Sequence, residues 1–182
     1  MKFKYKTVPY QHQKDALMLS FNKPNYAYFM EMGCGKSKVL LDNMAWLRLQ
    51  KQIDSAIIVA PKGVYRNWEL TEIPKHFLDE VEHEVFTWRA NPTKNQKDDL
   101  VRATKDRSKF RILLINVEGF ATPKVKRYTD AFIKNSNFLL AVDESTTIKN
   151  HQAKRTKALI NLGKQASYKR ILTGSPVTRS PM

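Results

Sequence analysis

Residues 26–37 read YAYFMEMGCGKS, in which a short apolar run passes directly into two closely spaced glycines, a lysine and a serine. The aromatic run over 26–30 predicts a β-strand, and the pattern from Lys36 onward is helical. Glycines let successive backbone N–H groups curl around phosphate oxygens, the lysine neutralises phosphate charge, and the serine hydroxyl is a ligand for Mg²⁺. Strand, loop and helix N-terminus together predict a site for nucleotide phosphates. The residues expected to line it are Met32, Gly33, Cys34, Gly35, Lys36 and Ser37.

The loop departs from the full phosphate-loop pattern at one place, because Met30 stands where that pattern has its first glycine. The match is therefore to the shorter Gly-x-Gly-Lys-Ser form. Gly-Lys-Ser alone occurs by chance in many proteins, so a second motif is needed to support the prediction. The placement of the loop between a strand and a helix is the first support.

The second motif is the apolar run FLLAV at 138–142, which is followed by Asp143 and Glu144. A buried strand that ends in two carboxylates places them at the carboxyl edge of a parallel sheet, where the phosphate loop also lies. In nucleotide hydrolases of this kind, Asp143 would hold Mg²⁺ and Glu144 would orient and polarise the attacking water. The alternative is an exposed acidic turn that caps the next helix.

Short β-rich runs alternate with longer amphipathic stretches along the chain. Strands are expected at 26–30, 56–60, 84–87, 111–115, 138–142 and 168–172. Helices are expected at 10–21, 36–50, 66–80, 94–106, 123–134 and 151–161. Most of the strands lack polar alternation, which is typical of strands covered on both faces by helices. The pattern predicts an α/β fold with a doubly wound parallel sheet, and the 182 residues fit a single domain.

The chain is strongly basic, with 32 Lys and Arg against 17 Asp and Glu and a formal net charge of +15. The segment 145–182 contains no acidic residue and eight basic ones, more than half of that net charge. A solvated helix face usually mixes signs, so clustering of one sign favours a polyanionic partner such as nucleic acid. An anionic membrane surface is the competing interpretation.

No apolar run approaches the roughly 18 residues of a membrane-spanning helix, so we expect a soluble protein. Nucleic acid is the partner that we expect, and no membrane. The single cysteine, Cys34, cannot form an intrachain disulfide, and the N-terminus lacks the apolar run of a secretory signal. We therefore expect a cytoplasmic protein that is not secreted.

Five segments, in order, resemble the first motor lobe of superfamily 2 helicases and translocases, most closely the Swi/Snf branch of double-stranded DNA translocases. The loop at 31–37 resembles the Glu-Met-Gly-x-Gly-Lys-Thr loop of that branch, which also accounts for the missing glycine at position 30. The segments are Pro9-Tyr10-Gln11, the loop 31–37, IIVAPK at 57–62 followed by Asn67-Trp68-Glu69, DESTTIKN at 143–150 and LTGSP at 172–176. The last two are similar to the branch's Asp-Glu-Ala-His-Arg-Ile-Lys-Asn and Leu-Thr-Gly-Thr-Pro.

The resemblance implies a RecA-like P-loop NTPase fold over residues 1–182, which binds ATP and Mg²⁺. Within it Gln11 would recognise adenine, and Ser37 with Asp143 would hold Mg²⁺. The catalytic residues that it implies are Lys36, Asp143 and Glu144. Short connections without inserted domains favour a minimal prokaryotic or viral member.

The resemblance also implies a nucleic-acid partner, double-stranded DNA. The residues expected to face it are Lys62, Asn116, Lys149 and Arg155. The residues expected to couple nucleotide state to that surface are Thr173, Gly174 and Ser175.

The chain departs from the Swi/Snf pattern at 145–147, where Ser-Thr-Thr replaces Ala-His-Arg. The histidine that in the family links hydrolysis to nucleic acid is therefore absent, and Thr146 could keep a hydrogen bond at its place. Gln13 is an alternative adenine contact, although a glutamine at a helix start more often faces solvent. Trp46 and Trp88 are expected in the core, whereas Trp68 stays open between core packing and an exposed role.

ATP in such motors lies between two RecA-like lobes, and the second lobe supplies arginine fingers. Only six residues follow Pro176 here. We expect an ATPase that is nearly inactive until a second lobe joins it in cis or in trans. The alternatives are another small P-loop ATPase or nucleotide kinase, and a DNA-binding module with a vestigial nucleotide site.

Overall fold

The structure is a computed structural model that describes residues 3–144 and 153–174. Its centre is one sheet in which every neighbouring pair of strands is parallel, in the order β1-β6-β5-β2-β4-β3. The strands are β1 (Asn25–Phe29), β2 (Ser55–Ala60), β3 (His83–Thr87), β4 (Phe110–Asn116), β5 (Phe138–Asp143) and β6 (Tyr168–Thr173). All of the expected strands are confirmed, as is the parallel α/β fold.

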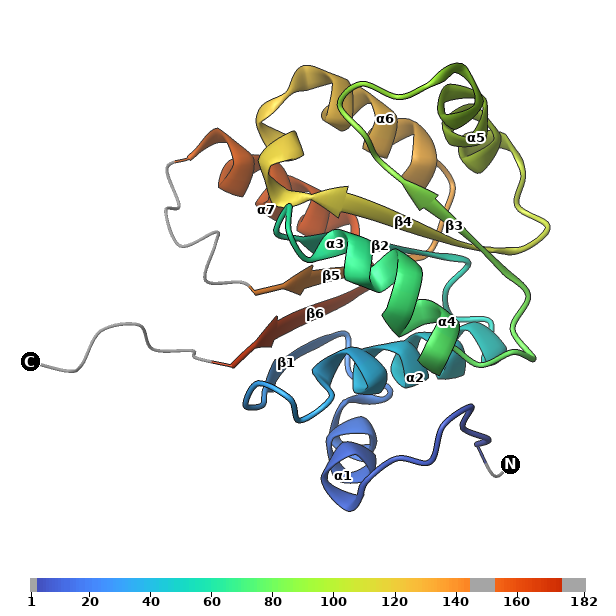
Figure 1. The fold of residues 1–182 in the computed structure, drawn as a ribbon, viewed down its shortest axis with the longest axis vertical. Helices are drawn as coiled ribbons and strands as arrows, with labels where there is room; N and C mark the ends of the chain where they lie inside the picture. The colour runs from blue at the N-terminus through green and yellow to red at the C-terminus, as the bar shows by residue number, and fades with distance from the viewer. Residues whose placement is uncertain (1–2, 145–152, 175–182) are drawn as a thin grey trace, which may run out of the picture.

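Helices cover both faces of the sheet, as Figure 1 shows. One face carries α1 (Gln11–Ser20), α2 (Lys36–Leu49) and the succession of α3 (Tyr65–Asn67), a π-helical turn η1 (Trp68–Glu72) and α4 (Ile73–His76). The other face carries α5 (Lys94–Lys105), the 3₁₀ turn η2 (Val117–Ala121), α6 (Pro123–Ile133) and α7 (Lys154–Gln165). None of the helices in the described ranges is long and apolar enough to cross a bilayer.

Strand β2 shows why the strands read as continuous apolar runs. Ile58 packs into the core beneath α1 and α2, while Ile57 and Val59 pack into the core on the α5–α7 side. All of these side chains are fully buried. Polar alternation is absent because neither face of the strand meets water.

The helix expected at 66–80 is the prediction that differs most from the structure. The helical path ends at His76, and Phe77 is extended, with φ −70° and ψ 134°. Phe77 and Leu78 are consecutive and both buried, together with Val81. A continuing helix would turn successive side chains by about 100° and expose one of them, so tertiary burial ends the helix early.

Helix α7 ends at Gln165, later than expected, because its last turns still face the sheet. Leu162 and Gly163 are buried, and a Cβ added at Gly163 would lie 3.7 Å from Leu140 Cδ2 of β5. The start expected at 151 lies outside the described residues. The end of the helix therefore packs against β5.

Arg170 is part of the basic C-terminal segment but lies in the interior. Its side chain is fully buried, and its guanidinium donates to Asn43 Oδ1 at 2.9 Å and to the Ser20 carbonyl at 3.0 Å. It ties β6 to α2 and to the end of α1. The expectation that the whole basic segment serves a polyanion is therefore wrong for Arg170.

A buried ion pair lies on α2 directly behind the glycine loop. Lys38 Nζ and Asp42 Oδ2 are 2.8 Å apart, and the two side chains are only 5% and 3% exposed. Burial raises the pKa of the Asp42 carboxyl to about 6, because desolvation outweighs the attraction of Lys38. Asp42 therefore takes up a proton in the folded protein at a higher pH than in the unfolded chain.

The raised pKa of Asp42 predicts a pH dependence of stability with a definite sign. Between about pH 4 and pH 6 the folded state holds a proton that the unfolded state has released, so the free energy of unfolding falls as the pH rises. We expect Asp42→Asn to reduce this fall in the free energy of unfolding by on the order of 2 kcal/mol. Urea unfolding at the two ends of this pH range measures the change. The exposed Asp98→Asn is the control, and equal slopes for both variants would contradict the prediction.

Candidate nucleotide site

The loop between β1 and α2 has the backbone that its glycines suggest. Gly33 and Gly35 have φ angles of 82° and 79°, in the left-handed region that glycine adopts without strain. A Cβ at Gly35 would also lie 2.3 Å from Gln13 Nε2, so any larger residue there displaces the glutamine. α2 begins at Lys36, so its first free N–H groups face the loop.

The Lys36 side chain folds back over the loop. Its Nζ donates to the carbonyls of Met30 at 2.8 Å and Glu31 at 3.1 Å. Lys36 and Ser37 both line a cavity of about 490 Å³ between the loop, α1 and α4. The Lys36 cation, the Ser37 hydroxyl and the N-terminus of α2 therefore lie at the same cavity, an arrangement suited to binding phosphate.

Gln11 and Gln13 have opposite environments. Gln11 is exposed and donates to Asp15 at 2.8 Å. Gln13 is 5% exposed, and its amide donates to the Cys34 carbonyl at 3.1 Å and accepts from the Tyr10 N–H at 3.0 Å. The expectation that Gln13 faces solvent is wrong: it lines the cavity and supports the loop. The contact of Gln11 with adenine stays a prediction.

Asp143 ends β5 at the same edge of the sheet as the glycine loop. Its Oδ2 accepts a hydrogen bond of 2.9 Å from Trp68 Nε1. Burial raises the pKa of Asp143, while the Trp68 hydrogen bond and the Lys36 charge oppose the rise. The next residue, Glu144, has φ 51°, a left-handed conformation uncommon outside glycine that marks the end of the strand.

Trp68 is the functional residue that sequence reasoning left open. It is 1% exposed and belongs to the core, yet its indole N–H reaches a carboxylate at the site. Buried tryptophans usually find a partner for this group, but the sequence does not say which one. Trp46 and Trp88 pack against the cores, as expected, with ring centroids 4.8 Å from Phe21 and 5.2 Å from Tyr128.

The end of β6 touches the glycine loop. The Thr173 carbonyl accepts from the Met30 N–H at 3.3 Å, and a Cβ at Gly174 would lie 3.4 Å from Met32 Cγ. The segment expected to couple nucleotide state to DNA thus contacts the loop expected to hold the nucleotide. Its third member, Ser175, lies outside the described residues.

Three of the four residues expected to face nucleic acid fall within the described ranges, and these three lie along the carboxyl edge as well. Lys62 is exposed in the turn after β2. Asn116 ends β4 opposite Ala60 of β2 and donates to Glu118 at 3.2 Å. Arg155 lies in the first turn of α7, which follows β5, and Lys149 is outside the described residues.

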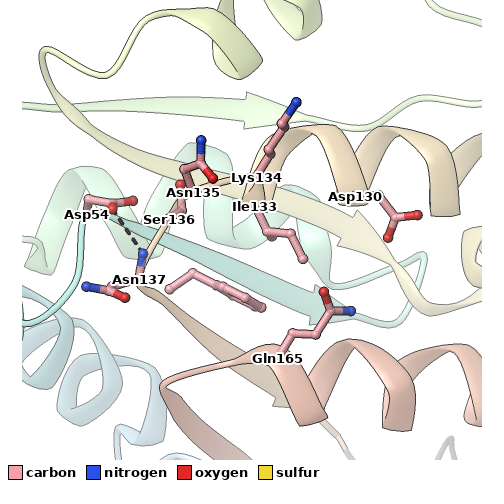
Figure 2. A pocket seen from close by; sticks show the side chains of 9 residues that line it. Asp54, Asp130, Ile133, Lys134, Asn135, Ser136, Asn137 and Gln165 are labelled. Carbon is pink, nitrogen blue, oxygen red and sulfur yellow. Dashed lines mark hydrogen bonds between the residues drawn. The ribbon is translucent and has the colours of Figure 1, made fainter.

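A second cavity, of about 530 Å³, lies at the opposite edge of the sheet, where β5 begins and α6 ends (Figure 2). Two carboxylates line it, and the partly exposed one, Asp54, accepts from the Asn137 N–H at 3.0 Å and from Arg111 at 3.3 Å. Asp54 thus holds strands and helix ends together, and none of the expected site residues lines this cavity.

The model of the SNF2-related domain matches residues 10–182. The chain belongs to the SNF2-related domain family. Among curated relatives of this SNF2-related chain, the ATP-dependent helicase FUN30 of Saccharomyces cerevisiae is 26% identical over 161 residues, 88% of this chain and 13% of the relative. Protein CHROMATIN REMODELING 24 of Arabidopsis thaliana is 26% identical over 184 residues, 96% of this chain and 16% of the relative. The chain thus spans only a small part of these relatives.

Solved structures confirm the fold of this SNF2-related domain. The Sulfolobus solfataricus SWI2/SNF2 ATPase core, solved in complex with double-stranded DNA, aligns with a TM-score of 0.71 at 18% identity, over 97% of this chain and 34% of that one. The UvsW helicase of bacteriophage T4 aligns with a TM-score of 0.62 at 16% identity, over 93% of this chain and 53% of that one. The expected RecA-like α/β architecture is therefore confirmed.

Ser37 and Asp143 of the SNF2-related domain have the donor chemistry that Mg²⁺ prefers, a hydroxyl and a carboxylate. Within the described residues there is no group of three or more His, Cys, Asp or Glu side chains that could hold a metal. Two protein oxygens completed by phosphates and waters are the usual arrangement for Mg²⁺ with a nucleotide, so the residues fit this ion.

Proposed function

We propose that this chain is the ATP-binding first motor lobe of a DNA helicase or translocase, which couples ATP hydrolysis to binding and movement on double-stranded DNA. The observation that supports it best is the meeting of the glycine loop 33–37, the Asp143 carboxylate and the end of β6 at one edge of the sheet. Helicase names among the relatives and the DNA complex of the solfataricus core agree with this proposal.

Each residue has a distinct task in this proposal. The N–H groups around Gly33 and Gly35 would cradle the phosphates, and Lys36 would move from the loop carbonyls to neutralise them. Ser37 and Asp143 would hold Mg²⁺, which when bound neutralises charge on the phosphate oxygens. Glu144 would orient and polarise the attacking water.

Equilibrium binding of a fluorescent ATP analogue with Mg²⁺ tests the nucleotide site. Saturable binding that ATP displaces, without phosphoryl transfer to a nucleoside monophosphate, supports the motor lobe. Transfer would instead support the nucleotide kinase. Absence of any binding would leave a DNA-binding module with a vestigial site.

Duplex DNA binding is expected to depend steeply on salt, because Lys and Arg that contact phosphates release counterions. Lys62→Ala should weaken binding and reduce the slope of log affinity against log salt by about 0.9, the value for one lost phosphate contact on duplex DNA. Lys134→Ala is the matched control, since Lys134 is exposed at the opposite edge, beside the start of β5. An equal loss in both variants, or binding that ignores salt, would remove the case for a DNA face at the carboxyl edge.

A further inference from the structure

The contact between Trp68 and Asp143 joins two segments that lie 75 residues apart in the chain. We propose that Trp68 is a positioning residue for Asp143: its indole N–H fixes the carboxylate in the orientation from which it holds Mg²⁺ beside the nucleotide. This inference rests on the proposed function, because it assumes that a nucleotide and Mg²⁺ bind at the glycine loop.

The indole is held firmly enough to orient another group. Trp68 is 1% exposed and packs in the core that contains Ile73 and Phe77, both buried. It begins η1, a single turn of π-helix, and such turns are frequent at functional sites. Its ring has one donor, Nε1–H, and that donor is committed to Asp143 Oδ2 at 2.9 Å.

The bond constrains the carboxylate without using up its acceptor sites. Oδ2 accepts from Trp68 and the carboxylate also accepts from the Glu144 backbone N–H, while its two oxygens together offer about four lone-pair sites, which leaves room for Mg²⁺ or its waters. Partners that orient a metal-binding side chain in this way typically change metal affinity by about 10- to 100-fold when they are removed. Trp68 would therefore act on metal affinity through Asp143 without touching metal or nucleotide.

The same contact gives the segment after β2 a direct connection to the nucleotide site. Lys62, Arg66 and Asn67 are exposed on this segment, and Glu69 pairs with Arg89 across 3.4 Å. Trp68 is the buried residue among them. A displacement of the segment by a bound polyanion would reach the Asp143 carboxylate through one rigid side chain.

The test is Trp68→Phe, which keeps an aromatic ring in the core and removes the indole N–H together with the five-membered ring that carries it. Trp88→Phe is the matched control, because Trp88 packs on the other face of the sheet against Tyr128. Binding of a fluorescent ATP analogue is titrated with Mg²⁺ and measured again in EDTA. We expect Trp68→Phe to raise the half-saturating Mg²⁺ concentration by about 10-fold or more, with unchanged binding in EDTA.

Three results would overturn the inference. An unchanged Mg²⁺ requirement in Trp68→Phe removes the positioning role while leaving the proposed function intact. Loss of binding in EDTA as well indicates that the ring only supports the fold. Failure of the wild-type chain to bind nucleotide at all would overturn the proposed function itself, and this inference with it.

A second measurement decides the contact even if Trp68→Phe does not fold. The chain has three tryptophans, so an ¹⁵N-labelled sample gives separate indole N–H resonances for Trp46, Trp68 and Trp88. Asp143→Asn should shift the Trp68 resonance and leave the other two in place. If no indole resonance moves, the hydrogen bond is absent in solution and the inference is wrong.

Discussion

Lys36→Ala is expected to weaken ATP binding by about 100-fold, since a hydrogen-bonded charge contributes about 1.5 to 3 kcal/mol. Lys36 is the cation at the start of α2, and its ammonium already lies within hydrogen-bond distance of the loop carbonyls of Met30 and Glu31. When ATP binds, this ammonium would leave the carbonyl oxygens and donate to the charged phosphate oxygens instead. Alanine has no ammonium group and makes neither interaction. Fluorescence titration with an ATP analogue and Mg²⁺ measures the effect.

Lys94→Ala is the matched control for this variant. Lys94 is also the first residue of a helix, α5, and it is exposed, but Thr93 caps that helix and no glycine loop precedes it. We expect unchanged ATP binding in Lys94→Ala and similar thermal unfolding for both variants. Equal ATP binding by wild type and Lys36→Ala would instead support a vestigial nucleotide site.

The features that the sequence predicts correctly are those set by local pattern. The strands are found because both faces of the sheet are buried, as the fully buried Ile57 and Ile58 illustrate. The glycine loop is found because Gly33 and Gly35 adopt backbone angles that other residues disfavour. Together they are enough to identify the fold and the place where phosphates would bind.

The features that the sequence does not predict depend on contacts between distant segments. Gln13 is buried because the loop offers it the Cys34 carbonyl, 21 positions away. Trp68 meets Asp143 only because the segment after β2 folds over the end of β5. Arg170 is a basic residue with a structural role, because its guanidinium donates hydrogen bonds to Asn43 Oδ1 and to the carbonyl at the end of α1. The hydrophobic periodicity of the sequence does not predict such contacts between distant residues.

These contacts place the glycine loop, the Asp143 carboxylate and the end of β6 along one edge of the sheet. Trp68 and Thr173 approach the nucleotide site from two different segments. A second lobe that closes over this edge would contact the phosphates from the side that the described residues do not cover. Positioning of Asp143 and closure by the second lobe would then act on the same bound ATP.

Supplying a second RecA-like lobe, fused after residue 182 or added as a separate chain, is expected to raise ATP turnover by about 10³ to 10⁵, the range that arginine fingers provide in comparable enzymes. In the proposed function Lys36 and the Mg²⁺ held by Asp143 would neutralise the ground-state charge, and cations from the facing lobe would stabilise the charge that develops on the transferred phosphoryl group. Steady-state phosphate release with duplex DNA measures the gain. Glu144→Gln in the joined protein should remove most of it, because in the proposed function Glu144 would polarise the attacking water. Robust DNA-stimulated turnover by the 182-residue chain alone would show that its active site is already complete.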